Sequence, residues 1–268
     1  MAAYTADGAN ENAHRPERKL GIESMPVALN APRSPGTPDK GDTARPDDAH
    51  ESLFTSGDYV RQFEPESVAN PFSRLYTRKR DAVISSITGS DRRVLDIGGG
   101  MGRIAIPLAQ RHFVTLTDIS THMLELARPW ESERLVLQQA NARSLPFVDE
   151  AFDFVVCIDV LPHIERPQEA IGEARRVLRP GGTLVIDSTN SVPLWTLAYP
   201  RYLGRNPLRW VKTWRSGGVP PEWSARVWHM RRARFKSLLI GGGFDPISIR
   251  GFGPPGCPKW HLAVATRL

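Results

Sequence analysis

The stretch Val94-Leu95-Asp96-Ile97-Gly98-Gly99-Gly100-Met101-Gly102-Arg103-Ile104-Ala105 decides the fold of this chain. Its first four residues suit the end of a buried strand, and four of the next five residues are glycine. An apolar pattern with helical spacing follows from Ile104. Glycines between a strand and a helix let a ligand lie against bare backbone, where unpaired N–H groups point outward. The stretch therefore predicts a nucleotide-like ligand.

The spacing of the glycines narrows the choice of nucleotide. A dinucleotide dehydrogenase has Gly-x-Gly-x-x-Gly after the strand; Gly98 and Gly100 fit this pattern, but the third position is Arg103. The phosphate-binding loop Gly-x-x-x-x-Gly-Lys-Ser/Thr does not occur in the sequence. A second apolar strand ends in Asp118, where a carboxylate can accept hydrogen bonds from both hydroxyls of a ribose. Ser120, two residues later, is expected to cap the next helix.

Short apolar strands alternate with amphipathic helices from residue 93 onwards. This alternation predicts a doubly wound, Rossmann-like α/β fold, in which a mostly parallel sheet is covered on both faces. The last strands should form an antiparallel pair and bring the sheet to seven strands. We expect strands at 93–97, 113–117, 135–139, 153–158, 183–187, 246–250 and 261–267, and helices at 102–111, 120–128, 167–178 and about 226–240.

The other segments differ from this core in composition. Residues 1–50 contain few large apolar residues, so we expect a disordered N-terminal tail. Residues 51–92 are expected to form a helical cap on the main domain of residues 93–268. Within that domain, prolines alternate with aromatic residues over 189–225, which predicts a lid insertion after the fifth strand.

The charge of the chain is unevenly distributed. The formal net charge is +6, yet residues 189–268 hold thirteen Lys/Arg against two acidic residues, together with six of the seven tryptophans. Neither a run of about 18 apolar residues nor a secretory leader pattern is present. Two cysteines, one of them in an apolar strand, do not suggest a disulfide framework. These features predict a cytoplasmic protein.

Later blocks of the sequence extend the pattern of the glycine loop. Together, these blocks resemble a class I S-adenosylmethionine-dependent methyltransferase of the type 11 small-molecule group. The resemblance leaves out both ends of the chain. The blocks that carry it are Val94 to Gly102, Asp118-Ile119-Ser120 with Met123, Asn141 to Phe147, Phe152 to Val156, Val160-Leu161-Pro162-His163-Ile164 and Leu178 to Leu184.

The resemblance implies S-adenosyl-L-methionine as the cofactor and assigns roles to the first two strand ends. It implies that Gly98, Gly100 and Gly102 let the backbone approach the methionine part of the cofactor. It also implies that Asp96 lies near the cofactor's amino group, directly or through water, and that Asp118 binds the ribose.

The same resemblance implies a set of residues around the adenine. Ile119 would pack on the ring, and the pair Asn141-Ala142 would meet its edge. The family more often has Asp at the position of Asn141, but an amide oxygen can still accept from the exocyclic amine. Met123 and Ile158 complete the predicted cofactor set.

The predicted catalytic residue is His163. Methyl transfer from a sulfonium needs mainly in-line positioning, and a hydroxyl or ammonium acceptor also needs a base. His163 follows the fourth strand, beside the expected methyl group, although a histidine there can instead merely pack or hydrogen-bond near the cofactor. Weaker candidates are Asp187, Tyr199 and His229. We expect no metal site.

The basic, aromatic segment leaves three interpretations of the acceptor open. It can be a lid whose aromatic residues and arginines bind an anionic small molecule. It can hold the protein at an anionic membrane, where a lipid-like or quinone-like acceptor resides. It can also be an ordinary solvated face over a Trp-containing core. The sequence does not decide between O-, N- and C-methylation.

Two other functions remain as alternatives. The Asn/Asp-Pro-Pro-Tyr motif of enzymes that methylate amino groups of nucleic acids is missing from the segment Ile158 to His163, which argues against a nucleic-acid partner. An RNA-directed methyltransferase therefore remains only an alternative. The other is a regulatory or assembly protein that binds S-adenosylmethionine without turnover.

Overall fold

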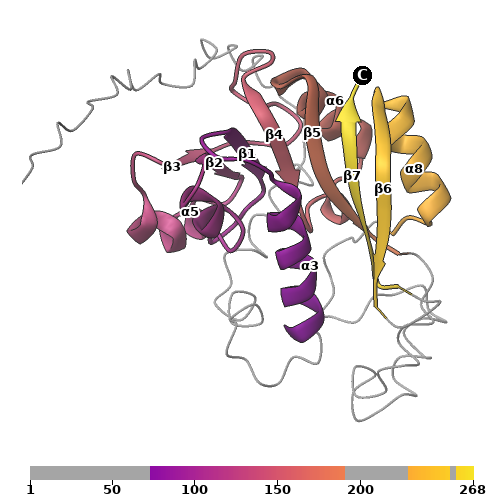
Figure 1. Ribbon diagram of the computed structural model, residues 1–268, viewed down its shortest axis with the longest axis horizontal. Coiled ribbons are helices and arrows are strands. Elements are labelled where there is room, and N and C mark those ends of the chain that lie inside the picture. The colour runs from indigo at the N-terminus through magenta and orange to yellow at the C-terminus, as the bar shows by residue number, and fades with distance from the viewer. Residues whose placement is uncertain (1–72, 191–228, 254–257) are drawn as a thin grey trace, which may run out of the picture.

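A seven-stranded sheet forms the centre of the protein (Figure 1). The computed structural model describes residues 73–190, 229–253 and 258–268. The strand order is β3-β2-β1-β4-β5-β7-β6, with β1 to β5 parallel and β7 antiparallel to both of its neighbours. This arrangement confirms the predicted Rossmann-like sheet with its antiparallel last strand. The strands are β1 (Arg93–Ile97), β2 (Phe113–Asp118), β3 (Leu135–Gln139), β4 (Phe152–Cys157), β5 (Leu178–Thr189), β6 (Phe244–Phe252) and β7 (Trp260–Arg267).

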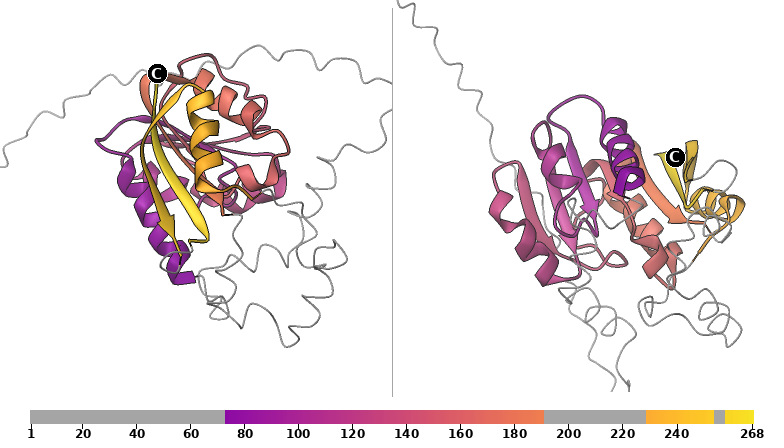
Figure 2. Two further views of the ribbon diagram at one scale, coloured as in Figure 1. Left: turned by 90° about the vertical axis from the view of Figure 1, so that its right-hand side faces the viewer. Right: turned by 90° about the horizontal axis from the view of Figure 1, so that it is seen from below.

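Helices cover both faces of the sheet (Figure 2). On one face, α3 (Ser73–Ser86), α4 (Ala105–Ala109) and α5 (Thr121–Ala127) pack their apolar residues into one buried cluster. On the other face, α6 (Pro167–Val177) and α8 (Arg232–Gly241) contribute to a second cluster. Two short 3₁₀ turns, η1 (Arg128–Trp130) and η2 (Leu161–His163), complete the described elements. β1 and β4 lie at the middle of the sheet, so each has a neighbouring strand on both sides. These neighbours hold the segments that follow β1 and β4 in place.

Most elements differ from the sequence-based bounds by one or more residues, and α8 begins at Arg232 rather than near residue 226. Two of the differences have a local structural cause. The helix expected at 102–111 is confined to α4, because Gly102 has a φ of +84°, which no residue of an α-helix adopts. The strand expected at 183–187 begins at Leu178, because a register irregularity between Phe152 and Phe154 of β4 accommodates the extra residues. Gly242, in the run of three glycines at 241–243, is the C-terminal cap residue of α8.

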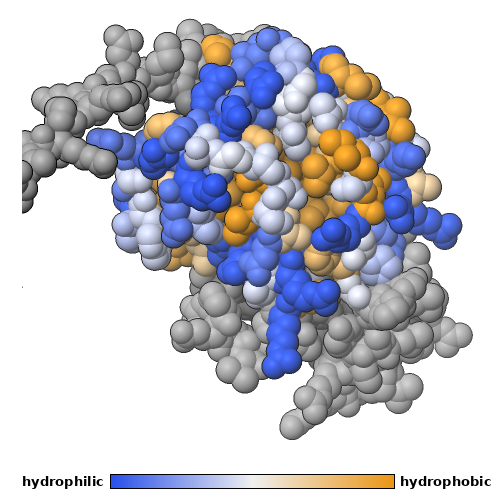
Figure 3. Space-filling view, in the orientation of Figure 1, coloured by the Kyte–Doolittle hydropathy of each residue, from blue (hydrophilic) through white to orange (hydrophobic). Residues whose placement is uncertain are grey.

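Several predicted segments lie outside the described residues. These are the tail of residues 1–50, the first part of the cap segment, and the predicted lid except for Thr189 and Asn190. Within the cap segment, residues 73–86 form α3. In the described part of the chain, no helix combines the length and the hydropathy that a membrane span requires. On the face seen in Figure 3, hydrophilic residues separate the hydrophobic ones, and a hydrophobic patch lies over β6 and β7.

Candidate active site

The glycine loop connects β1 to α4 and is tied to the end of β2. Gly98, Gly100 and Gly102 have φ values of +64°, +55° and +84°, which residues with a side chain rarely adopt. The N–H of Gly99 donates to the carbonyl of Thr117 at 3.0 Å. A Cβ atom on Gly100 would meet only Asp118 Oδ2 among the described residues within 4 Å, at 3.9 Å. The loop thus exposes its backbone at the carboxyl edge of the sheet.

Asp118 ends β2 and faces this loop. Its Oδ2 accepts the N–H of Gly100 at 3.0 Å, and its Oδ1 accepts the N–H of Ser120 at 2.9 Å. Burial raises the pKa of this carboxyl, while the backbone donors act in the opposite direction. A carboxylate has about four acceptor sites, so each oxygen can accept a further hydrogen bond. Ser120 caps α5 as expected, since its Oγ accepts the N–H of Met123 at 3.4 Å.

Asp96, inside β1, is buried and only partly satisfied. Its side chain is 1% exposed, and its Oδ2 has no hydrogen-bond partner within the described parts of the chain. Burial, with a contribution from the charge of Asp118, raises the pKa of Asp96 to about 8, although the N–H of Ala105 offsets part of this effect. A buried polar atom without a partner is costly, and it is a frequent mark of a ligand site.

The other residues of the predicted cofactor set lie at the ends of β2, β3 and β4, except for Met123, which lies in α5. Ile119 is half-buried, while Met123 and Ile158 are buried. Asn141 holds the turn after β3, because its Oδ1 accepts the N–H of Arg143 at 2.9 Å. Ala142 packs against the cluster that contains α6 and α8. Asn141 thus also stabilises the turn after β3, a role that the sequence did not indicate.

The segment after β4, which runs through Asp159 and Val160 to the end of η2 at His163, lies against the glycine loop. Asp159 has a φ of +59°, an unusual value for a residue with a side chain, and Val160 follows it. A Cβ atom on Gly98 would lie 2.4 Å from Val160 Cγ2, so the two segments are in close contact. His163 ends η2 and is half-buried, with its N–H donating to the carbonyl of Val160 at 2.9 Å. The structure therefore places His163 in the segment that contacts the glycine loop.

A buried lysine joins α3 to the ends of β4 and β5. The Nζ of Lys79 donates to both carboxylate oxygens of Asp159, at 2.7 and 2.8 Å, and to Asp187 Oδ2 at 2.7 Å. Lys79 and Asp187 are fully buried, whereas the side chain of Asp159 is 34% exposed. The Oδ1 of Asp187 also accepts the N–H of Asp159 at 2.7 Å. These contacts fix the start of the segment after β4.

The charges in this cluster compensate each other. Burial acts to lower the pKa of Lys79, but the two carboxylates more than offset it, so this pKa lies above its ordinary value. Burial acts to raise the pKa of Asp159, but the Lys79 ammonium outweighs it, so that pKa lies below its ordinary value. For Asp187 burial prevails over Lys79 and raises the pKa. Together, Lys79 and Asp159 form a stable ion pair.

Aromatic rings surround the lysine. Lys79 Nζ lies 4.4 Å from the ring centroid of Trp260 and 5.3 Å from that of Tyr76. Lys259 Nζ lies 4.2 Å from the Trp260 centroid, and burial lowers the pKa of Lys259 to about 8. The guanidinium of Arg103, in the turn before α4, lies 4.6 Å from the Tyr76 centroid. Thus α3 contacts both the glycine loop and β7.

Lys79 was not among the residues predicted from the sequence. A lysine in an amphipathic helix is ordinarily expected on the solvated face. However, Tyr76, Lys79, Val83 and Ile87 recur at spacings of three and four, and Val83 and Ile87 are buried. That spacing was the available indication that Lys79 faces inward. Asp187, a weaker candidate in the sequence, proves to be the partner of Lys79. Tyr199 lies outside the described residues.

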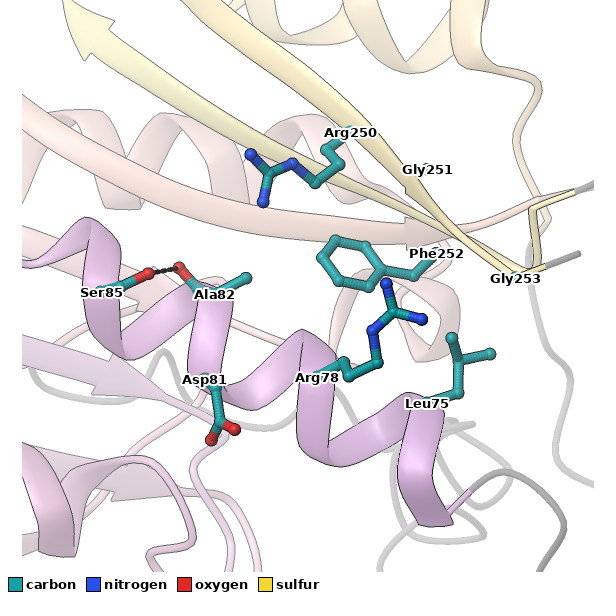
Figure 4. A pocket seen from close by; sticks show the side chains of 9 residues that line it. All are labelled: Leu75, Arg78, Asp81, Ala82, Ser85, Arg250, Gly251, Phe252 and Gly253. Carbon is teal, nitrogen blue, oxygen red and sulfur yellow. Dashed lines mark hydrogen bonds between the residues drawn. The ribbon is translucent and has the colours of Figure 1, made fainter. Parts of the chain in front are cut away.

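A separate groove of about 410 Å³ lies between α3 and β6 (Figure 4). Arg78 and Arg250 extend on either side of Phe252 there, and Asp81 lies on the same helix as Arg78. No residue of the glycine loop lines this groove. It belongs to the outer face of α3, whereas Tyr76 and Lys79 lie on the inner face.

The sequence of the central segment matches a known domain family. Residues 95–186 match the family model of the methyltransferase domain. They belong to this family. The matched segment contains β1 to β4, most of β5, the glycine loop and the segment after β4. The predicted family is therefore confirmed for the methyltransferase domain.

Relatives with similar sequences include enzymes that are named for O-methylation. An O-methyltransferase of Aspergillus nomiae is 37% identical over 130 residues, which are 46% of this chain and 57% of the relative. A ubiquinone biosynthesis O-methyltransferase of Alkalilimnicola ehrlichii is 30% identical over 139 residues, 50% of this chain and 56% of the relative. The chain thus spans little more than half the length of these relatives.

Solved structures share the fold. Magnesium protoporphyrin IX methyltransferase from Synechocystis, with bound S-adenosylhomocysteine (SAH), has a TM-score of 0.64 at 18% identity, covering 83% of this chain and 100% of that chain. The [4+2]-cyclase SpnF has a TM-score of 0.57 at 19% identity, covering 74% of this chain and 83% of that one. The fold of the methyltransferase domain is thus shared by proteins named for different reactions, so function must be argued from the site.

Proposed function

We propose that this protein transfers a methyl group from S-adenosyl-L-methionine to a small-molecule acceptor. The observation that carries the proposal is the arrangement of two carboxylates around the glycine loop: Asp118 bonded to Gly100, and Asp96 with one unpaired oxygen within the described structure. The family of residues 95–186 supports it, as does a relative named for O-methylation in ubiquinone biosynthesis.

The residues at the loop fit the cofactor in three respects. The unpaired, buried Oδ2 of Asp96 suits a donor such as the cofactor's amino group, directly or through one water. The space beside Gly100 is open, so the cofactor can closely approach the backbone of this residue. The remaining acceptor sites of Asp118 suit the two ribose hydroxyls. Asn141 can still donate from its Nδ2 to an adenine ring nitrogen while its oxygen caps the turn.

When bound, the cofactor supplies a methyl group that its sulfonium already activates. The chain then has to orient the acceptor, exclude water and accept a proton. Leu161 and Pro162 are buried, and Val160 contacts the glycine loop, so this segment can exclude water from the reacting atoms. His163 ends η2 in the same segment, and we assign to its imidazole the role of accepting the proton of an acceptor hydroxyl.

Binding and turnover test the proposal separately. Isothermal titration calorimetry with SAH measures the cofactor site; the absence of binding by the folded wild-type chain would overturn the proposal. Incubation with methyl-labelled S-adenosylmethionine and fractionated metabolite extracts, followed by mass identification, then finds the acceptor and the methylated atom. Binding without any labelled small molecule would favour a regulatory protein, and label in RNA would favour a nucleic-acid methyltransferase.

An anionic acceptor is a further part of the proposal. Arg103 and Lys259 are the cations whose charges act on the partly exposed carboxylate of Asp159, in addition to Lys79. An acceptor that carries a carboxylate, phosphate or phenolate would meet the positive charge of Arg103 and Lys259 near Asp159. Charge-neutral analogues of the identified acceptor should therefore have a higher KM.

A further inference from the structure

Lys79 uses its entire hydrogen-bonding capacity at the junction of three elements. An ammonium has three N–H donors, and here two go to Asp159 and one goes to Asp187. The side chain comes from α3, whereas Asp159 follows β4 and Asp187 lies near the end of β5. A charge buried at this depth is costly unless it is fully paired, and Lys79 is fully paired.

Two adjacent residues, Asp159 and Val160, connect the ion pairs of Lys79 to the glycine loop. Asp159 is held at its side chain by Lys79 and at its N–H by Asp187. Val160 follows directly and lies in contact with Gly98. The positive φ of Asp159 is an unfavourable conformation for a residue with a side chain, and it persists only where surrounding contacts enforce it. Lys79 and Asp187 provide those contacts.

We propose that Lys79 is a positioning residue of the cofactor site: by binding Asp159 and Asp187 together, it holds the segment after β4 against the glycine loop. The inference rests on the proposed function, because it concerns the same cofactor site. Lys79 acts through Asp159 and Val160 and does not touch the cofactor.

Removal of the ammonium would leave the two carboxylates facing each other without the one cation that is hydrogen-bonded to both of them. Such a pair cannot stay fully ionised in a buried site, so the pKa of one of the two carboxyls rises. At low pH a shared proton keeps the pair together; at high pH repulsion separates the two strand ends. The other titratable groups around the pair are Tyr76 from α3, Arg103 from the turn before α4, Cys157 from β4 and Lys259 from the segment before β7.

The test compares SAH affinity by calorimetry at pH 6, 7, 8 and 9 for the wild type and Lys79→Met. Methionine keeps most of the apolar volume and removes the charge. We expect the ratio of the variant's Kd to the wild-type Kd to rise with pH, by up to about tenfold per pH unit, the limit for one linked proton. Arg78→Met, which removes an exposed cation from the same helix, should keep this ratio near one at every pH.

A second variant separates charge from packing. In Lys79→Met/Asp187→Asn, the amide oxygen can still accept the N–H of Asp159, and the repulsion is gone, so the Kd ratio should no longer depend on pH. A ratio for Lys79→Met that does not change with pH overturns the proposal, even if affinity is reduced, because lost packing has no such pH dependence. If Lys79→Met does not fold, a folded double variant with a pH-independent ratio supports it, whereas a double variant that does not fold overturns it. Failure of the wild type to bind SAH would instead count against the proposed function.

Discussion

The Oδ2 atom of Asp118 accepts the backbone N–H of Gly100 at 3.0 Å, which links the end of β2 to the middle of the glycine loop. The link has two consequences. It fixes Gly100 in a left-handed conformation beside a carboxylate, and it leaves that carboxylate with acceptor sites for a ligand. The same residue can therefore shape the loop and bind the ribose.

Replacement of Asp118 by alanine should weaken SAH binding by about tenfold to a hundredfold, since hydrogen bonds to a charged group contribute about 1.5–3 kcal/mol. Calorimetry on the purified variant measures the change. Asp81→Ala is the matched control, because Asp81 is an exposed carboxylate on α3 that pairs with Arg80. Equal affinities for Asp118→Ala and the control would mean that Asp118 only shapes the loop.

The raised pKa of Asp96 predicts a pH-dependent stability. The folded-state pKa is about 8, whereas the unfolded value is near 3.8, so the folded protein retains a proton that the unfolded chain releases between these pH values. The free energy of unfolding should therefore fall as pH rises from about 4 to about 8, at a rate of up to about 1.4 kcal/mol per pH unit. Asp96→Asn should lose this dependence. Urea denaturation at a series of pH values tests it; identical slopes in both proteins would contradict the prediction.

Cofactor binding should release the same proton. An ammonium near Asp96 favours the ionised carboxylate and lowers its pKa. At pH 7 the wild type should therefore release close to one proton on binding SAH, and Asp96→Asn should release less. Calorimetric titrations in buffers of different ionisation enthalpy give the number of protons. Equal proton release by the two proteins would place the cofactor's amino group elsewhere.

Most of the sheet could be predicted because its strands are short apolar runs separated by turn residues. β1 and β3 have the bounds that the sequence predicts, and the glycine loop and Asp118 follow from strict local patterns. The start of α4 could not be predicted, because the apolar spacing from Ile104 onwards does not reveal the positive φ of Gly102.

Long-range charge pairing limited the prediction of the site. Lys79 and Asp187 are separated by 108 residues, and only the packing of α3 onto the sheet brings them together. Asn141 resembles a cofactor residue in the sequence, yet its oxygen is bonded to the next turn of the backbone. A single sequence reports local spacing well, but it does not report which polar groups meet across the sheet.

The predicted role of His163 can be tested once the acceptor is known. If His163 accepts the acceptor's proton, His163→Ala should reduce kcat by about 10² to 10⁴, the usual contribution of a general base, with a small effect on KM. The wild-type kcat should also rise with pH as the base loses its proton, and the variant should lose this dependence. Steady-state kinetics with the identified acceptor provides both measurements. A variant with unchanged kcat would show that the histidine only packs in the segment after β4.

The contact between Gly98 and Val160 gives a test that needs neither ligand nor acceptor. Gly98→Ala adds a Cβ 2.4 Å from Val160 Cγ2 and also forces alanine into a φ of +64°. Gly181→Ala is the matched control, because its φ is +68° and no described atom lies within 4 Å of the added Cβ. Both should lose stability through the unfavourable φ, but Gly98→Ala should lose about 1–3 kcal/mol more, the usual cost of overpacking. Val160→Ala in the Gly98→Ala background should recover part of the difference, because it removes the clashing methyl groups. Chemical denaturation measures all four proteins; equal losses for the two glycine variants would mean that the segment after β4 does not press on the glycine loop.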